Sequence, residues 1–220
     1  MRRRPKEPNA DFPLAAVLNG SGEVINVITK LKYGNTNTFL LRGTSGNLLV
    51  DTDYAGTLPA FYRAIKEQGI RVCDIDYILA THYHPDHMGL VSELMKQGVK
   101  LLLMDTQRPF VHFSDDIFAR DKRLHYEPIS EDTATVISFA ESRAFFGNLG
   151  IHGEIVATPS HSEDSISLIL DSGECFVGDL EPMEYLDAYE QKEELKRDWE
   201  LIMGHAPKVI YYAHANHKRL

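Results

Sequence analysis

The stretch "YILATHYHPDHMGL", residues 77–90, holds three histidines and an aspartate within six positions of a 220-residue chain that has ten histidines. These residues are His82, His84, Asp86 and His87. A buried imidazole is costly to desolvate without a partner, so packing alone explains this density poorly. The apolar run ahead of the histidines is typical of a short strand. We therefore expect the cluster to lie at a strand end.

The spacing of the cluster suits two neighbouring cations. On an extended strand end, residues two apart point the same way, so His82 and His84 face one point. Pro85 disfavours helical geometry at His84 and keeps this segment extended. The chain then turns into a helix, so Asp86 and His87 approach from another direction. Two imidazoles on one side, with a carboxylate and an imidazole on the other, favour a pair of metal ions over a single structural zinc.

Three further residues occupy similar positions in the chain. His161 ends the strand pattern "GEIVATPSH", Asp179 ends "ECFVGD" and His214 ends "KVIYYAH". An isolated histidine is most often an ordinary residue. Strand ends meet at one edge of an α/β protein, however. We therefore expect these three residues to join the cluster.

The order of strand, site, helix and strand indicates a layered α/β protein. We expect strands at residues 23–31, 36–42, 46–53, 74–80, 99–104, 153–161, 165–170, 174–179 and 208–214, and helices at 57–69, 87–98, 130–150 and 190–204. Segment 105–129 shows no clear period. No repeat or low-complexity linker divides the chain. The sequence thus predicts a single domain over residues 1–220, with a loosely ordered segment at residues 1–20.

Composition excludes several kinds of partner. The formal net charge is −9, which disfavours nucleic acid, and no apolar run is long enough for a membrane span.

The sequence also bears on where the protein is found. We expect no signal peptide. Cys73 and Cys175 lie in apolar surroundings and are expected to be buried free thiols, which indicates a cytoplasmic protein. The expected partner is a small-molecule substrate. The sequence is also compatible with a homo-oligomer.

Taken together, these motifs resemble the metallo-β-lactamase fold superfamily. The resemblance rests on the H-x-H-x-D-H run, the later histidine after a Thr-Pro segment, the Gly-Asp pair after a strand and the final strand-end histidine. It extends from about Tyr33 to His214 and includes the acidic strand end "LLVDTD". It implies a four-layer αββα sandwich of two mixed β-sheets, with helices on the outer faces and a dinuclear metal site along one edge.

The resemblance also implies a role for each residue of the cluster. The implied ligands are His82, His84 and His161 for one zinc ion, Asp86, His87 and His214 for the other, and Asp179 as the bridge. Iron or manganese are alternatives to zinc. Asp86 would also act in catalysis by orienting the nucleophile. Asp51 matches a position where a carboxylate orients a ligand imidazole, although it would also suit a turn cap.

Three positions depart from the pattern of the family. Ser160 stands where a glycine commonly precedes the later histidine, and Asp53 stands where a glycine commonly follows the acidic strand end. The segment "AHANH" replaces a Gly-His-Gly-like turn, which leaves His217 as a rival to His214. None of the departures removes a ligand.

The implied activity is hydrolysis by a metal-bridging hydroxide. A small ester, thioester or lactone is the preferred substrate, because the acidic chain shows no substrate-binding appendage of the ribonuclease kind. The alternatives are a phosphodiesterase of the same fold and a sulfur dioxygenase with one iron, held by residues at His82, His84 or His161, and Asp179. Flavodiiron oxidoreductases carry glutamate where this chain has His84. A non-catalytic binding module would be expected to have lost ligands.

Segment 105–129 is rich in aromatic residues that would either form an apolar wall over the metals or pack onto the core. These residues are Phe110, His112, Phe113, Phe118 and Tyr126. Long irregular loops are often functional, but not always. Tyr185 is a similar case: it could donate a hydrogen bond to an oxyanion, but packing is the favoured interpretation.

Overall fold

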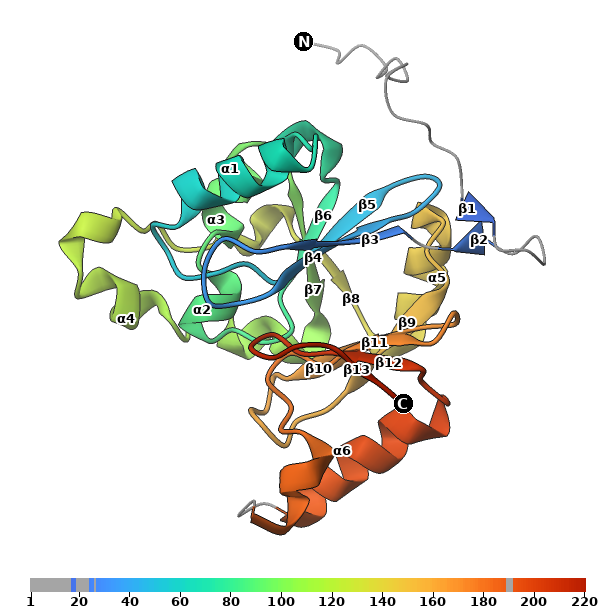
Figure 1. Ribbon diagram of the computed structural model, residues 1–220. Coiled ribbons are helices and arrows are strands. Elements are labelled where there is room, and N and C mark those ends of the chain that lie inside the picture. The colour runs from blue at the N-terminus through green and yellow to red at the C-terminus, as the bar shows by residue number, and fades with distance from the viewer. Residues whose placement is uncertain (1–16, 19–23, 26, 189–191) are drawn as a thin grey trace.

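Two mixed β-sheets lie face to face with helices on their outer sides, as the sequence predicts (Figure 1). The computed structural model describes residues 17–18, 24–25, 27–188 and 192–220. The expected loose segment at residues 1–20 lies outside the described residues, apart from Val17 and Leu18. Single-domain organisation stays a prediction.

In the described chain the first sheet has the strand order β3-β4-β5-β6-β7-β8. Its strands are β3 (Val27–Leu31), β4 (Thr38–Arg42), β5 (Asn47–Val50), β6 (Tyr77–Leu79), β7 (Lys100–Met104) and β8 (Thr135–Ile137). The first three strands pair antiparallel, and β5 to β8 pair in parallel. The carboxyl ends of β5 and β6 therefore lie at the same edge.

The second sheet has the order β13-β12-β11-β10-β9 within the described ranges. Its strands are β9 (Gly153–Ala157), β10 (Ile166–Leu170), β11 (Glu174–Phe176), β12 (Val209–Tyr211) and β13 (Lys218–Arg219). Strand β10 is antiparallel to both β9 and β11, and β11 is parallel to β12. Consequently β9, β11 and β12 run in one direction. A separate short ladder pairs β1 (Val17–Leu18) with β2 (Val24–Ile25).

Helices cover the outer faces of both sheets, while the helix at residues 139–149 packs Phe146 and Leu149 into the layer between them. The helices are α1 (Leu58–Glu67), α2 (Pro85–Met88), α3 (Val91–Lys96), α4 (Asp115–Ala119), α5 (Phe139–Leu149) and α6 (Lys192–Gly204). Figure 1 shows α1 and α3 on the far side of the first sheet and α6 on the far side of the second. The helices between parallel strands thus pack back onto the sheet that they connect.

Three apolar layers hold these elements together. Strand residues alternate between layers, as period-2 geometry requires: Leu40 packs with the outer helices, while Leu41 packs between the sheets. Phe61 of α1 is completely buried in the outer layer. Trp199 of α6 packs in the third layer against the second sheet. Burial of each such side chain stabilises the fold by about 1.5–3 kcal/mol.

The helix expected at residues 130–150 is wrong in its first part. Val136 and Ile137 belong to β8, and helix α5 begins at Phe139. Ser138 and Glu141 form a capping box at this start, because the Glu141 carboxylate accepts hydrogen bonds from the backbone and hydroxyl of Ser138. The apolar residues suit a β-branched edge strand as well as a helix, so their spacing did not separate the two.

The helix expected at residues 87–98 is interrupted. It forms as α2 and α3, with Gly89 between them. A Cβ atom at Gly89 would lie 2.3 Å from the backbone nitrogen of Ala55. The interruption therefore falls where two backbones pack closely, which only glycine allows.

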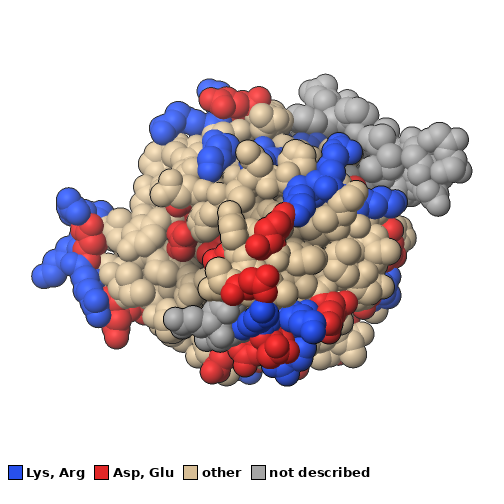
Figure 2. Space-filling view, turned by 60° about the horizontal axis from the view of Figure 1, so that its bottom comes forward, with Lys and Arg blue, Asp and Glu red and all other residues tan. Residues whose placement is uncertain are grey.

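The expectation of two buried thiols holds only for Cys175. Both cysteines are free, but Cys73 is exposed, because it lies in the short 3₁₀ turn Val72–Asp74 at the surface. None of the described helices is long and apolar enough to cross a membrane. Figure 2 shows acidic and basic side chains interspersed on the described part of the face turned toward the viewer.

Candidate metal centre

The strand directions bring all seven predicted ligands to one place. Strands β9, β11 and β12 end just before His161, Asp179 and His214, and β6 ends just before His82. The side chains form overlapping groups whose ligand atoms lie within 4.8 Å of one another. The groups are His82, His84 and His161; His82, His87 and Asp179; and Asp86, His87 and His214.

Three imidazoles form the first half of the centre. The Nδ1 atom of His84 lies 3.1 Å from Nε2 of His82 and 3.2 Å from Nε2 of His161. Three nitrogens bound tetrahedrally to one zinc, at about 2.0–2.1 Å each, would be separated by about 3.3 Å. The spacing of the imidazoles thus fits a shared cation.

A carboxylate and two imidazoles form the second half. The Nε2 atom of His214 lies 3.1 Å from Oδ2 of Asp86, and Nε2 of His87 lies 4.0 Å from Oδ1 of the same residue. His217 instead lies beside Tyr211, with ring centroids 5.6 Å apart. The structure therefore brings His214, and not His217, into the centre.

Asp179 lies between the two halves. Its Oδ2 is 3.3 Å from Nε2 of His87 and 3.8 Å from Nε2 of His161, while its Oδ1 is 3.3 Å from Nε2 of His214. The preceding glycine has a positive φ of 56°, and a Cβ there would lie 2.5 Å from the hydroxyl of Thr81. The Gly-Asp pair thus lets the strand end approach the histidine loop closely.

Asp51 orients an imidazole of the second half. Its Oδ2 lies 3.0 Å from Nδ1 of His87, and it also accepts hydrogen bonds from the backbone N–H and the hydroxyl of Thr81. Asp51 has a left-handed φ of 57°, which is strained for a residue other than glycine and is typical of functional sites. Its hydrogen bond directs the other ring nitrogen of His87 toward the centre.

Histidine pKa values shift in opposite directions in the two halves of the centre. Burial lowers the pKa of His82 and of His161, so these imidazoles stay neutral with a free lone pair. Burial opposes charging of His87, but the carboxylates of Asp51 and Asp179 outweigh it and raise its pKa to about 10. Contacts with Asp179 and Asp86 raise the pKa of His214 to about 10.

The carboxylate that joins the halves is itself held ionised. Burial opposes the ionisation of Asp179, but its close contacts with the imidazoles of His214 and His87 keep its pKa well below the usual range. Its Oδ1 and the Nε2 of His87 are buried and have no hydrogen-bond partner of satisfactory geometry. Buried polar atoms without such partners are rare. Nitrogen and carboxylate donors left in this way fit a pair of zinc, iron or manganese ions.

Two of the departures from the family pattern have a structural basis. Ser160 does not adopt a positive φ, and its backbone N–H donates to Asp198 of α6 at 2.8 Å, so glycine is not required. Asp53 is buried, and its carboxylate lies where a side chain at residue 34 would be: a Cβ on Gly34 would be 1.6 Å from Oδ2 of Asp53. Gly34 therefore makes room for the aspartate.

The aromatic residues of segment 105–129 divide between core and site. Phe118 is buried and packs on Tyr126, with ring centroids 4.3 Å apart, and Phe110 packs against the same core. Phe113 is 57% exposed, and its ring centroid lies 5.6 Å from that of His84. His112 forms exposed ion pairs. Of the predicted wall, Phe113 is thus the residue beside the metal centre.

Tyr185 was expected to pack, and its exposure argues against this. It is 60% exposed in the 3₁₀ segment Met183–Ala188. Its role as a donor to an oxyanion stays a prediction.

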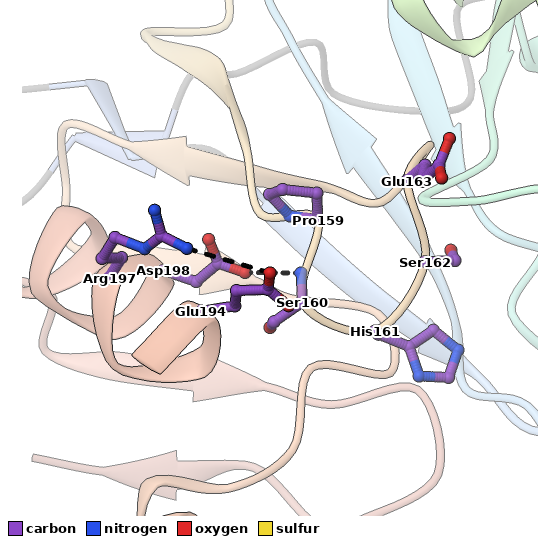
Figure 3. A pocket seen from close by; sticks show the side chains of 8 residues that line it. All are labelled: Pro159, Ser160, His161, Ser162, Glu163, Glu194, Arg197 and Asp198. Atoms are coloured by element: carbon purple, nitrogen blue, oxygen red, sulfur yellow. Dashed lines mark hydrogen bonds and ion pairs between the residues drawn. The ribbon is translucent and has the colours of Figure 1, made fainter. Parts of the chain in front are cut away.

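A polar hollow of about 580 Å³ flanks the metal centre. Figure 3 shows it between α6 and the loop that carries His161, whose ring points away from the helix residues. The lining residues are Pro159, Ser160, His161, Ser162, Glu163, Glu194, Arg197 and Asp198. The hollow is acidic, because its lining includes three carboxylates and one guanidinium.

Sequence reasoning missed several buried polar residues in the loops around the centre. They are Thr36, Asn37, Gln107, Ser114 and Asp164. No spacing or motif marks them, because each acts through backbone groups that are distant in sequence. In the sequence, the one indication of these residues is that the loops beside the motif are polar.

Comparison with known proteins points to one family. Residues 31–214 match the family model of the metallo-beta-lactamase superfamily. A beta-lactamase-like protein 2 homolog of Drosophila melanogaster is 26% identical over 216 residues, covering 92% of this chain and 68% of that protein. The flavo-diiron protein FprA2 of Clostridium acetobutylicum is 34% identical over 79 residues, which cover 36% of this chain and 19% of that protein.

Structural similarity extends over most of the chain. A crystal structure of a metallo-beta-lactamase family protein from Thermus thermophilus superposes with a TM-score of 0.63 and 19% sequence identity. The superposition covers 89% of this chain and 74% of the other. At this identity the similarity shows the fold.

Proposed function

Since this chain belongs to the metallo-β-lactamase superfamily, whose members are mostly metal-dependent hydrolases, we propose that it is a hydrolase with two divalent cations, zinc by preference. The observation that carries the proposal is the position of Asp179, whose carboxylate lies 3.8 Å from Nε2 of His161 in the first half and 3.3 Å from Nε2 of both His87 and His214 in the second. A carboxylate in this position suits a bridge between two ions. Two zinc sites that shared no ligand would not need a carboxylate between them.

The side chains have distinct roles in this proposal. Bound zinc ions would lower the pKa of water toward neutrality and polarise the substrate carbonyl. Asp86 is partly exposed and contacts His214, so its carboxylate is accessible to orient the nucleophile by accepting a hydrogen bond from it. Asp51 keeps His87 in one tautomer with Nε2 facing the centre.

The surroundings support a small ester, thioester or lactone as substrate. The exposed ring of Phe113 beside His84 offers an apolar surface for an acyl group. The hollow beside His161 is acidic, because Glu163, Glu194 and Asp198 outnumber Arg197. An acidic surface repels a phosphodiester and accepts a neutral ester.

A substrate screen after metal reconstitution tests the proposal. The chain is stripped with chelator, reloaded with zinc and assayed on esters, thioesters, lactones, β-lactams and phosphodiesters. We expect zinc-dependent turnover of an ester, thioester or lactone that is lost in Asp179→Ala and kept in the control His217→Ala. Turnover of phosphodiesters alone would overturn the substrate class, and oxygen uptake with one iron would overturn the hydrolase.

A further inference from the structure

Past the strand ends, several backbone groups in the loops of the metal centre pair with side chains, and not with a neighbouring strand. Buried backbone N–H and C=O groups are almost always paired. Five buried side chains outside the ligand set supply these partners, and none is more than 4% exposed. They are Thr36, Asn37, Gln107, Ser114 and Asp164. They fall into two sets that hold different ligand loops.

The peptide group of Tyr83, between the first two histidines of the cluster, is held from two sides. Its N–H donates to Oδ2 of Asp164 at 2.6 Å, and its C=O accepts from the hydroxyl of Ser114 at 2.7 Å. Asp164 follows His161 by three residues. Its carboxylate therefore ties the loop of His161 to the segment that carries the other two histidines.

Gln107 makes a second tie between the same two loops. Its Nε2 donates to the backbone carbonyls of Ala80, Thr81 and Asp164 at 3.0, 3.3 and 3.1 Å. The first two carbonyls directly precede the histidine cluster, and the third lies in the loop of the later histidine. We call Gln107, Ser114 and Asp164 the first frame.

A different pair of side chains holds the second half. The hydroxyl of Thr36 donates to the backbone carbonyl of Asp86 at 2.7 Å. The side-chain amide of Asn37 donates to the carbonyls of Tyr212 and Ala215, at 2.9 and 2.8 Å, on either side of the final histidine. We call Thr36 and Asn37 the second frame.

We propose that each frame positions one half of the metal centre, so that disrupting one frame weakens the ion of its own half more than the ion of the other. The first frame positions His82, His84 and His161, and the second positions Asp86 and His214. This inference rests on the proposed pair of cations. No hydrogen bond joins the two frames within the described residues, and loss of a partner that orients a metal ligand typically weakens metal binding about 10- to 100-fold.

Matched variants of one residue from each frame test this proposal. Thr36→Val removes the hydroxyl and Thr36→Ser keeps it; Asp164→Ala removes the acceptor and Asp164→Asn keeps one. Each full-length chain is stripped of metal and titrated with Co²⁺, followed by its visible absorption. His84→Ala and His214→Ala provide reference spectra for chains that have lost one half.

We expect Thr36→Val to bind one ion as the wild type does and the other at least tenfold more weakly. The tight ion should have the spectrum seen in His214→Ala. Asp164→Ala should show the converse, with the spectrum of His84→Ala. The conservative variants Thr36→Ser and Asp164→Asn should restore both ions, which a general loss of stability would not explain.

Two results would overturn the frames. One is an equal weakening of both ions in each variant, and the other is wild-type titration in both. A wild-type chain that binds a single ion would instead overturn the dinuclear function, and the frames with it. Thermal unfolding of the metal-free chains checks folding; if a variant is unfolded, Asn37→Asp or Ser114→Ala replaces it in the same frame.

Discussion

The Oδ2 atom of Asp51 lies 3.0 Å from Nδ1 of His87, which directs the other ring nitrogen of His87 toward Asp179 at 3.3 Å. Asp51 also accepts two hydrogen bonds from Thr81, beside His82. One carboxylate outside the ligand set thus links the strand end of β5 to both halves of the centre.

Asp51→Asn should weaken metal binding without unfolding the chain. Asparagine has the same shape and tolerates a left-handed φ, but its amide is a weaker acceptor for the imidazole N–H. We expect an affinity loss of about 10- to 100-fold for one of the two ions, measured by zinc titration against a competing chelator. Unchanged affinity would show that Asp51 serves only as a turn cap.

Phe113→Ala should affect substrate binding and leave metal content intact. The ring lies beside His84 but is not a ligand, so its loss removes apolar contact with an acyl group. We expect KM for a long-chain ester or thioester to rise about three- to tenfold, with a smaller rise for an acetyl ester. Met203→Ala on α6, another exposed apolar side chain, is the control. Equal effects on both substrates would contradict contact with the acyl group.

Gly34→Ala should destabilise the chain because of one specific contact. The new Cβ would lie 1.6 Å from Oδ2 of Asp53, so the buried carboxylate must move. We expect a loss of about 1–3 kcal/mol in the free energy of unfolding. In an Asp53→Gly background the same substitution should be tolerated much better, and a double-mutant cycle in urea measures the difference. Additive effects would show that the two sites are independent.

Asp198 gives a pH-dependent prediction. Burial raises the pKa of Asp198, although hydrogen bonds from Ser160 oppose the shift. The folded state therefore binds this proton more tightly than the unfolded state, and stability is lost as pH rises through the ordinary pKa toward the raised one. Its charged neighbours are Arg197 and Glu194.

Asp198→Asn removes this loss and keeps an oxygen for the backbone N–H of Ser160. We expect the Tm of the metal-free variant to exceed that of the wild type by more at pH 7 than at pH 4, measured by differential scanning calorimetry. A Tm difference that is the same at both pH values would contradict the assignment.

The positions of the candidate ligands could be predicted because they follow strand ends. Short apolar strands are readable from sequence, and strands of one direction deliver their carboxyl ends to one edge of a sheet. His161, Asp179 and His214 each follow such a strand, and the structure gathers them beside His82. The strand β8 and the interruption at Gly89 were missed, because β-branched residues suit two structures and because the approach of residues 53–55 is a tertiary contact.

The frames could not be predicted for a related reason. Thr36 and Asp86 are 50 residues apart, and Asn37 and Ala215 are 178 apart. Their hydrogen bonds go to backbone carbonyls, which every residue has. The sequence therefore does not show which residue accepts each of these hydrogen bonds. Metal ligands, in contrast, must be of particular residue types.

The central claim is that Asp179 joins two cation sites in one hydrolytic centre. Metal quantification of the purified full-length chain, before and after zinc reconstitution, tests it most directly. We predict about two zinc ions per chain in the wild type and in His217→Ala, with reduced content in Asp179→Ala. One iron per chain with oxygen uptake, or two zinc ions retained at full affinity in Asp179→Ala, would contradict the claim.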